Sequence, residues 1–270
     1  MYNRNLFPGR LIPDAIEMER EGKGYIYDDN DKDVLKRLCD EINQTYPDYP
    51  YKFDYLCEIS IVALPAGSSS ILLKYIHQFE SESCRAFLLS KIICDDVKIK
   101  GLDKIVMDLY HHFRSSSYYV APPKSGGTAH IHIAYDNAFR ILKSSKIMSE
   151  IVELLKSRRE VYILALTAQM IAKKWAPKEL EEIMVAHLMN KKLTREDVNI
   201  PEYGEYHPSL ENIAQQTSFT AIKCLQYYPS EENLKIIMSY TNHPYEELAK
   251  FAQEHTKKMA TKLLLMKENN

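Results

Sequence analysis

Apolar residues recur every three or four positions along most of this chain, which is the period of an amphipathic α-helix. One stripe occurs twice, 54 residues apart: residues 178–184 and 232–238 both contain Leu-x-x-Ile-Met. Pro177 and Pro229 precede the two copies, and proline is favoured at the start of a helix. The pattern therefore predicts a helix–turn–helix unit that is repeated.

From residue 68 onward, the predicted helices form consecutive pairs separated by polar or breaker-rich turns. The expected helices span residues 68–79, 84–92, 102–112, 128–143, 147–157, 159–175, 177–190, 208–227, 231–241 and 244–266. The serines at 68–70 offer an N-cap to the first of them. A single pair cannot bury its apolar face alone, so neighbouring pairs are expected to stack into an α-solenoid, an all-α fold of the α-α superhelix type.

The first 67 residues follow a different pattern. Short helices are expected over 11–21 and 34–44 and an apolar segment over 55–64, while the tyrosine- and proline-rich stretch 45–51 cannot be a continuous helix. An end repeat needs a cover for its apolar face. We therefore expect residues 1–67 to form an irregular helical N-terminal cap and residues 68–270 to form one continuous elongated domain of repeats.

The second helices of the pairs resemble those of HEAT-like repeats. In that family a turn bearing Pro, Asp or Glu is followed by an aliphatic residue, often by Arg, and then by small residues. Residues 82–88, 160–165 and 244–252 are similar to this pattern. The resemblance covers roughly 70–266 and is closest over 229–259.

The resemblance departs from the family at the arginine position. The arginine is present only as Arg85, and Tyr162 and Ala249 replace it elsewhere, which leaves the subfamily open. Repeat spacing is also irregular, so a compact α-α helical bundle remains the alternative fold.

Composition supports a helical protein of a reducing compartment. Only 8 Gly and 12 Pro occur, which argues against a multi-strand sandwich. The 5 cysteines form an odd set without a Cys-x-x-Cys pair, and most lie in apolar helical patterns. No signal-peptide pattern opens the chain and no stretch approaches ~18 apolar residues, so we expect a cytoplasmic protein without membrane insertion.

Charge is unevenly distributed although the formal net charge is only −2. Residues 1–60 carry 13 acidic and 8 basic side chains, whereas residues 140–195 carry 12 basic and 6 acidic ones. In a solenoid such blocks become separate surface zones, which favours a charged partner. Solvated lysines on outer helix faces are the simpler explanation.

The resemblance to HEAT-like repeats implies that the second helices line a concave face. The residues expected near that face or at its rim are Arg85, Arg158, Arg159, Tyr162, Gln169, Lys173 and Lys250. A tyrosine among cations is typical of a protein-binding hot spot. We therefore expect a non-enzymatic scaffold that binds another protein through its concave face and loops, as a regulator, an adaptor or a toxin-neutralising immunity protein, with no cofactor and no metal.

Nucleic-acid binding is the main alternative. Stacked helical repeats resemble the DNA-alkylation-repeat glycosylases, and the basic block 140–195 together with Lys257, Lys258, Lys262 and Lys267 would suit a phosphate backbone. The balanced overall charge opposes this interpretation, because nucleic-acid binders usually carry a strong basic excess. The catalytic residues of that family cannot be placed on this sequence.

Four histidines could form a metal or enzymatic site if the Gly/Ser-rich segment 114–128 folds back. His111 and His112 would then approach His130, His132 and Asp136, which are plausible zinc ligands by type. Residues two apart on a helix point about 200° apart, so His130 and His132 cannot both chelate from one helix. No nucleophile–base signature is present.

Two further patterns have simpler explanations than ligand binding. Residues 28–33 alternate oxygen ligands as a calcium loop does, but Val34 stands where an EF-hand needs glycine, so an acidic helix start is favoured. Residues 124–128 could offer amides to a phosphate, but the P-loop order is absent. A connector explains that segment more simply.

Overall fold

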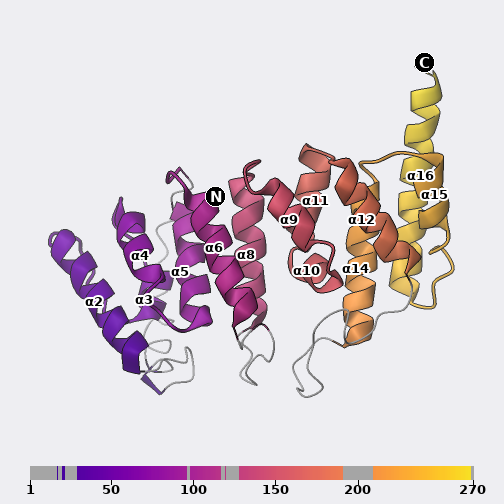
Figure 1. Cartoon of the computed structure of the whole chain (residues 1–270). Helices are drawn as coiled ribbons and strands as arrows, with labels where there is room; N and C mark the ends of the chain where they lie inside the picture. The colour runs from indigo at the N-terminus through magenta and orange to yellow at the C-terminus, as the bar shows by residue number, and fades with distance from the viewer. Residues whose placement is uncertain are drawn as a thin grey trace. The chain divides into compact units, whose positions relative to one another are not determined.

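The computed structural model describes residues 29–95, 98–116, 128–190 and 209–268, with Glu17, Arg20, Glu21 and Tyr119. Within these residues there are 13 helices and no strand, so the all-α prediction is confirmed (Figure 1). In the same part of the chain, no helix combines the length and apolar character needed to cross a bilayer. The chain divides into two compact units. Unit 1 comprises Met1–Arg114 and Gly127–Ile141, and unit 2 comprises Ser115–Gly126 and Leu142–Asn270.

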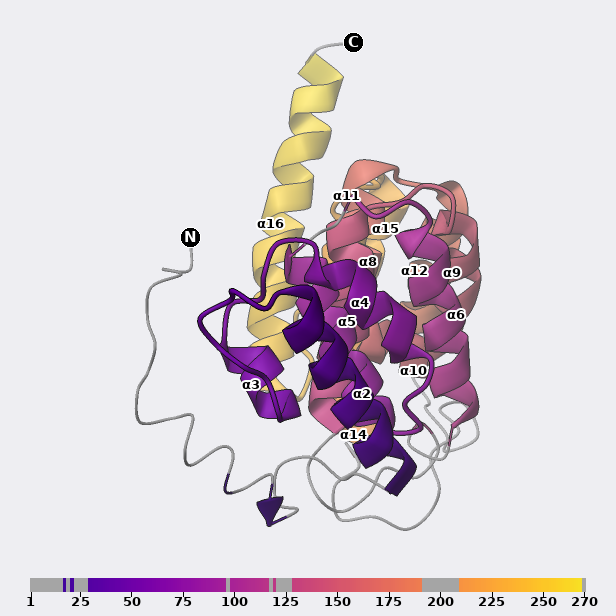
Figure 2. The same ribbon diagram turned by 90° about the vertical axis from the view of Figure 1, so that its left-hand side faces the viewer.

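Unit 1 is built from helices that pack on near neighbours in the sequence. They are α2 (Asp29–Thr45), α3 (Leu56–Ile61), α4 (Ser68–Ile76), α5 (Glu82–Asp95), α6 (Leu102–Ser115) and α8 (Thr128–Leu142). The helix α4 packs against both α2 and α5, and α3 also packs on α5 (Figures 1 and 2). The tyrosine- and proline-rich stretch separates α2 from α3, as predicted. The expected helix over 11–21 lies almost wholly outside the described residues.

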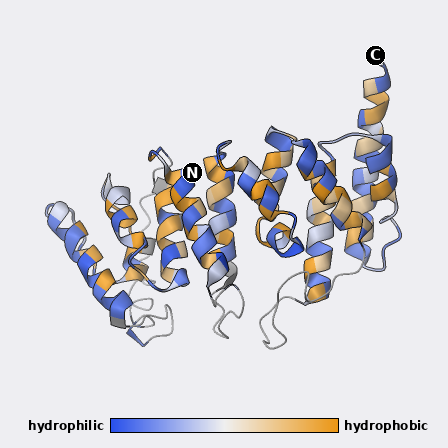
Figure 3. Ribbon diagram, viewed as in Figure 1, coloured by the Kyte–Doolittle hydropathy of each residue, from blue (hydrophilic) through white to orange (hydrophobic). Residues whose placement is uncertain are grey.

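An aromatic cluster forms the core between α6 and α8. Tyr110 contacts Tyr135 edge-on at 5.1 Å and Phe139 at 5.5 Å, while Phe113 stacks on Tyr135 at 5.4 Å. All four side chains are essentially inaccessible to solvent. Their spacing on each helix is the three- or four-residue period of the sequence pattern, which appears in Figure 3 as apolar stripes. Burying four rings at such distances stabilises this pair of helices beyond the area effect alone.

The acidic start of α2 has a structural task. Asp31 is buried, and its carboxylate accepts hydrogen bonds from the backbone amides of Glu80 (2.6 Å) and Ser81 (3.0 Å). These amides lie at the N-terminus of α5, where unpaired N–H groups favour a negative charge. Asp31 therefore ties α2 to α5.

Unit 2 is arranged around α14 (Leu210–Leu225). The other helices are α9 (Met148–Leu154), α10 (Arg158–Ile163), α11 (Ala165–Lys174), α12 (Lys178–Met189), α15 (Glu231–Met238) and α16 (Glu246–Glu268). The helix α14 packs against α10, α11, α12 and α16, and α15 packs against α12 and α16. The helix α14 is therefore the central helix of unit 2.

The sequence-based prediction assigned the N-cap of one helix to the wrong residue and missed one helix break. Gly67, with φ of 90°, occupies the N-cap position of α4, whereas the predicted serine cap accepts no capping hydrogen bond. The expected helix 159–175 is divided at Leu164, which has φ −104° and ψ 35°. The short helix α10 buries five of its six residues, whereas α11 buries only one face. The break lets these two buried surfaces face different directions.

The two copies of the repeated stripe are not buried alike. Met184 is fully buried in α12, whereas Met238 is 50% exposed at the end of α15. The buried stripe of α15 instead uses Asn233, Ile236 and Ile237. The Asn233 amide donates hydrogen bonds to Glu181 Oε1 (2.6 Å) and to the carbonyl of Tyr228 (2.7 Å). The second copy has therefore shifted its buried face by about one residue.

Candidate functional site

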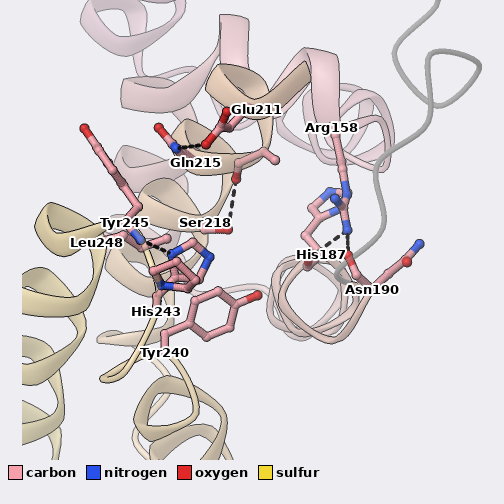
Figure 4. A pocket seen from close by; sticks show the side chains of 12 residues that line it. Arg158, His187, Asn190, Glu211, Gln215, Ser218, Tyr240, His243, Tyr245 and Leu248 are labelled. Atoms are coloured by element: carbon pink, nitrogen blue, oxygen red, sulfur yellow. Dashed lines mark hydrogen bonds between the residues drawn. The ribbon is translucent and has the colours of Figure 1, made fainter. Parts of the chain in front are cut away.

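A pocket of about 450 Å³ opens within unit 2 (Figure 4). Side chains from four helices and one turn line it: Arg158 of α10, His187 and Asn190 at the end of α12, Glu211, Ala214, Gln215 and Ser218 of α14, Tyr240, His243, Pro244 and Tyr245 of the turn after α15, and Leu248 of α16. The lining mixes amide, imidazole, hydroxyl and apolar groups. Such a composition is typical of a binding recess.

Arg158 fixes one wall of this pocket. Its guanidinium donates hydrogen bonds to the carbonyl of His187 (2.9 Å) and to that of Asn190 at the end of α12. The last carbonyls of a helix lack intrahelical partners and carry a partial negative charge, so a cation stabilises them. Arg158 is only 7% exposed. The expected exposed position at a rim is therefore not observed, because the end of α12 covers this side chain.

His187 links the same helix end to α9. Its Nε2 lies 2.8 Å from the carbonyl of Leu155, which requires the proton to be on that nitrogen. Burial lowers the pKa of His187 below its ordinary value of 6.5, and the nearby Arg158 charge lowers it further, while the hydrogen bond to Leu155 acts in the opposite direction. His187 is thus held as a neutral imidazole in the folded chain.

This neutral histidine makes unit 2 sensitive to acid. Because the pKa of folded His187 lies below 6.5, the unfolded chain binds the proton first, and unit 2 is expected to lose stability as the pH falls below 6.5. Urea unfolding between about pH 7.5 and 5.5 measures this loss. The His187→Gln variant keeps a donor but cannot titrate, so it should show a shallower slope. An identical slope in both proteins would contradict the assignment.

The turn after α15 supplies the opposite wall. The Tyr240 hydroxyl donates to the carbonyl of Leu188 at 2.7 Å, and burial raises the pKa of Tyr240. The ring of His243 stacks on Tyr240, with 5.8 Å between centroids and planes 11° apart. His243 Nδ1 accepts the backbone N–H of Tyr245 at 3.1 Å, so a neutral His243 carries its proton on Nε2. This turn therefore offers one oriented imidazole N–H.

The face of α14 completes the pocket with hydrogen-bonding groups. Gln215 Nε2 donates to Glu211 Oε1 at 3.1 Å, and the Ser218 hydroxyl donates to the carbonyl of Ala214 at 2.9 Å. Nucleophilic catalysis needs a hydroxyl or thiol within reach of a general base. The Ser218 and Tyr240 hydroxyls instead donate to main-chain carbonyls. Both hydroxyl protons are therefore already engaged by the main chain.

Arg159 and Glu160 form a buried cluster beside the pocket wall. The Arg159 guanidinium lies 3.7 Å from the ring centroid of Tyr119, and the Tyr119 hydroxyl donates to Glu160 Oε1 at 2.6 Å. Arg159 is 6% exposed and Glu160 is fully buried. Their opposite charges share one enclosed environment with an aromatic ring between them. Like Arg158, Arg159 does not occupy the exposed rim expected from sequence.

Arg85 is likewise buried, within unit 1. Its Nη1 lies 2.7 Å from Glu82 Oε1, and the same oxygen lies 2.7 Å from His112 Nδ1. Arg85 Nε and Glu82 Oε2 are buried without a hydrogen-bond partner. The exposed position expected for Arg85 is therefore not observed, because Glu82 one turn earlier draws the guanidinium inward.

The other four predicted contact residues retain some exposure in unit 2. Tyr162 is half-buried, and burial raises the pKa of its phenol. Gln169 is partly exposed, Lys173 is exposed, and Lys250 is exposed with an ion pair to Glu246. None of the four lines the pocket. Their role in binding a partner stays a prediction.

The predicted histidine cluster is only partly described. His112 contacts Glu82, and His132 packs edge-on against Phe113 at 5.7 Å. The side chain of His130 and most of the segment 114–128 lie outside the described residues, as does the loop around Pro201 and Gly204. Among the residues that are described, no group of three or more His, Cys, Asp or Glu could hold a metal ion. All five cysteines are free thiols.

Sequence reasoning missed most of the pocket. Of its lining, only Arg158 was expected to bind a partner. Residues 242–244 were noticed as an Asn-His-Pro turn, which is a chain reversal signal rather than a site signal. His187, Gln215 and Tyr240 lie on helices or turns more than 20 residues apart, and only packing around α14 brings them together. No protein-family model, no curated protein and no solved structure matches this chain.

Proposed function

We propose that this protein is a non-enzymatic HEAT-like repeat scaffold that binds a segment of a partner protein in the pocket of unit 2. The observation that carries this proposal is that main-chain hydrogen bonds fix the hydroxyl and imidazole groups of the pocket. The hydroxyls of the buried Tyr240 and the partly buried Ser218 donate to main-chain carbonyls, and the two imidazoles are each oriented by a main-chain hydrogen bond. Such fixed groups bind a ligand without reorganising, which favours recognition.

The packing order of the helices supports a repeat architecture. Many helices that are close in sequence pack together: α4 on α5, α10 on α11 and α15 on α16, while α12 contacts α14 and α15. The helix α14 departs from this order, because it also packs on α10 and α11. Repeats are stabilised by contacts of this near-neighbour kind. The α-α superhelix remains part of the proposal, and it would supply the extended surface that a partner protein needs, roughly 800 Å² per side.

The expected ligand is a neutral, extended peptide segment. Gln215, Asn190 and the Nε2–H of His243 present both donors and acceptors, which are the groups that pair with peptide N–H and C=O. The ring of Tyr245, which is partly exposed, adds apolar surface for a side chain of the ligand, whereas Tyr240 and Leu248 are buried parts of the lining. Among the described lining residues Arg158 is the only Arg or Lys, and it is engaged by carbonyls, so a strongly anionic ligand would gain little.

Filling the pocket is expected to abolish partner binding without unfolding the protein. Ala214 is partly exposed and lines the pocket, so Ala214→Met places a larger side chain in the space that the peptide would occupy. Hot-spot changes cost about 2 kcal/mol or more, which is roughly a thirtyfold loss of affinity. Affinity capture from native-host extract, followed by titration with the recovered partner, measures the effect.

The matched control is Gln216→Met, because Gln216 is the exposed neighbour of Gln215 on α14 and does not line the pocket. The control should bind as the unmodified chain does. Equal binding by Ala214→Met would show that the partner uses another surface and would overturn the assignment of this pocket. A regulator, an adaptor and an immunity protein would all behave in this way.

The nucleic-acid alternative receives less support from the arrangement of charges. Within the described part of the basic block, Lys156 pairs with Glu153 and Glu179, and Lys178 lies 3.8 Å from Glu182. Interleaved carboxylates weaken the field that a phosphate backbone requires. We therefore retain protein binding as the proposed function.

A further inference from the structure

A second pocket, of about 380 Å³, lies in unit 2 between the end of α14 and the middle of α16. Its lining is strongly basic: Lys223, Gln226, Tyr227, His255, Lys258, Thr261 and Lys262. Three ammonium groups, those of Lys223, Lys258 and Lys262, line this one recess. The recess shares no residue with the pocket proposed to hold the partner peptide.

The three lysines are held in different ways. Lys262 Nζ donates to the carbonyl of Gln226 at 2.6 Å and lies 5.5 Å from the ring centroid of Tyr227. Lys258 pairs with Glu254 of the preceding turn, and both side chains are more than half exposed. Lys223 makes no ion pair with any residue that the structure describes. The Glu254 carboxylate interacts electrostatically with both Lys258 and Lys223, so one acidic side chain offsets part of the charge of three ammonium groups and the recess stays net positive.

His255 shows that these charges act on one small region. Its side chain is 2% exposed, and Nδ1 lies 3.0 Å from the carbonyl of Phe251. Burial lowers the pKa of His255, the hydrogen bond to Phe251 and the Glu254 charge act in the opposite direction, and the charges of Lys223 and Lys258 lower it further. His255, Lys223 and Lys258 line the same recess, and a neutral imidazole adds a polar group there without adding repulsion.

From this convergence we propose that the recess between α14 and α16 binds the phosphate group of a small molecule. A phosphate monoester carries a charge of about −1.5 to −2 and three acceptor oxygens near neutral pH. The three lysines supply that positive charge, and the Tyr227 hydroxyl belongs to the same lining, while the buried Gln226 amide donates to the carbonyl of His255 at 3.0 Å and holds α14 to α16. A carboxylate brings one charge and two oxygens, so it would leave part of the positive charge uncompensated.

The surroundings favour a compact anion over a nucleic-acid backbone. A backbone needs a row of cations along a groove, whereas Glu254 lies beside Lys258 and Glu231 holds Lys267 at 2.8 Å. The carbonyl groups at the end of α14 also oppose an anion, because a helix C-terminus is partially negative. Lys262 donates a hydrogen bond to the Gln226 carbonyl, and Lys223 lies in the last turn of α14. Both cations therefore offset the partial negative charge at this helix end.

The ring of Tyr227 indicates what the phosphate would carry. It is partly exposed and forms one side of the recess, with Lys262 near its face. An aromatic group attached to the phosphate could stack on this ring, since aromatic pairs add about 0.5–1.5 kcal/mol. We therefore expect phenyl phosphate to bind more tightly than inorganic phosphate, by up to roughly tenfold.

Calorimetric titration of the full chain with inorganic phosphate, phenyl phosphate and acetate tests the proposal. Replacing Lys223→Gln should weaken the binding of both phosphates about tenfold, because a hydrogen bond to a charged group contributes about 1.5–3 kcal/mol. Lys250→Gln is the matched control, since Lys250 is an exposed lysine of α16 outside the recess. It should leave both affinities unchanged.

Several results would overturn the proposal. They are the absence of phosphate binding at millimolar concentration, equal affinity for acetate and phosphate, or equal losses in Lys223→Gln and Lys250→Gln. A single-stranded oligonucleotide that binds far more tightly than phenyl phosphate, with a steep salt dependence, would identify a nucleic-acid surface instead. The Ala214→Met variant should bind phosphate normally, so failure of the peptide pocket and failure of this site are distinguishable.

Discussion

Replacing Arg85 by alanine is expected to lower the free energy of unfolding of unit 1 by about 3–5 kcal/mol. The Arg85 and Glu82 side chains are 8% and 1% exposed and form a 2.7 Å ion pair. Removing the arginine leaves the Glu82 carboxylate buried, with one oxygen lacking a hydrogen-bond partner and the other keeping only its contact with His112. Loss of one partner from a buried ion pair is among the most destabilising changes in a folded protein.

Urea unfolding followed by far-UV circular dichroism measures this loss, and two variants control it. The double variant Glu82→Leu, Arg85→Leu removes both charges and should recover most of the stability. Lys74 of the Lys74–Glu41 pair is 58% exposed and can be changed to alanine with little loss, because exposed ion pairs contribute little to stability. A loss for Arg85→Ala no larger than that of Lys74→Ala would contradict the buried pair.

The second large effect is expected at Arg158. The Arg158→Met variant keeps most of the apolar stem but loses the hydrogen bonds to the carbonyls of His187 and Asn190. Hydrogen bonds to a charged group contribute about 1.5–3 kcal/mol each, so unit 2 should lose about 3 kcal/mol of stability. The end of α12 should loosen, and partner binding in the pocket should weaken with it.

The single tryptophan, Trp175, lies in unit 2 and reports this unfolding by fluorescence. Lys173→Met is the control, because Lys173 is an exposed cation of α11 and surface changes usually stay within about 0.5 kcal/mol. If both variants unfold at the same urea concentration, Arg158 does not hold the end of α12. Faster amide exchange at residues 187–190 in Arg158→Met alone would support its capping role.

Helix positions were largely predictable because they depend on local periodicity. The helix expected over 177–190 is observed as α12, and the one expected over 231–241 as α15. Apolar stripes and helix caps depend on residues that are close in sequence, so they can be recognised in a single sequence. The division at Leu164 was not predictable, because no proline or glycine marks it in the sequence.

The burial of the three arginines could not be predicted for a different reason. Arg85, Arg158 and Arg159 have long stems that can reach solvent or turn inward, and the choice depends on groups brought close by folding. Glu82 lies near Arg85 in sequence, but the carbonyl of Asn190 is 32 residues from Arg158. A repeat alignment predicts the position of an arginine on its helix, but it does not predict which group the guanidinium will contact.

The pocket itself was the least predictable feature. It forms because α14 contacts four helices and because the turn after α15 places Tyr240 and His243 against α12. No local sequence motif marks the residues that line it. They form a site only because folding brings them together.

Hydrogen–deuterium exchange of the chain with and without its captured partner tests the central claim most directly. The proposed function predicts that partner binding slows exchange at residues 187–190, 211–218 and 240–248, which line or flank the pocket. It also predicts no such protection with the Ala214→Met variant. Protection confined to unit 1, or protection along the lysines of α16 that nuclease treatment abolishes, would contradict it.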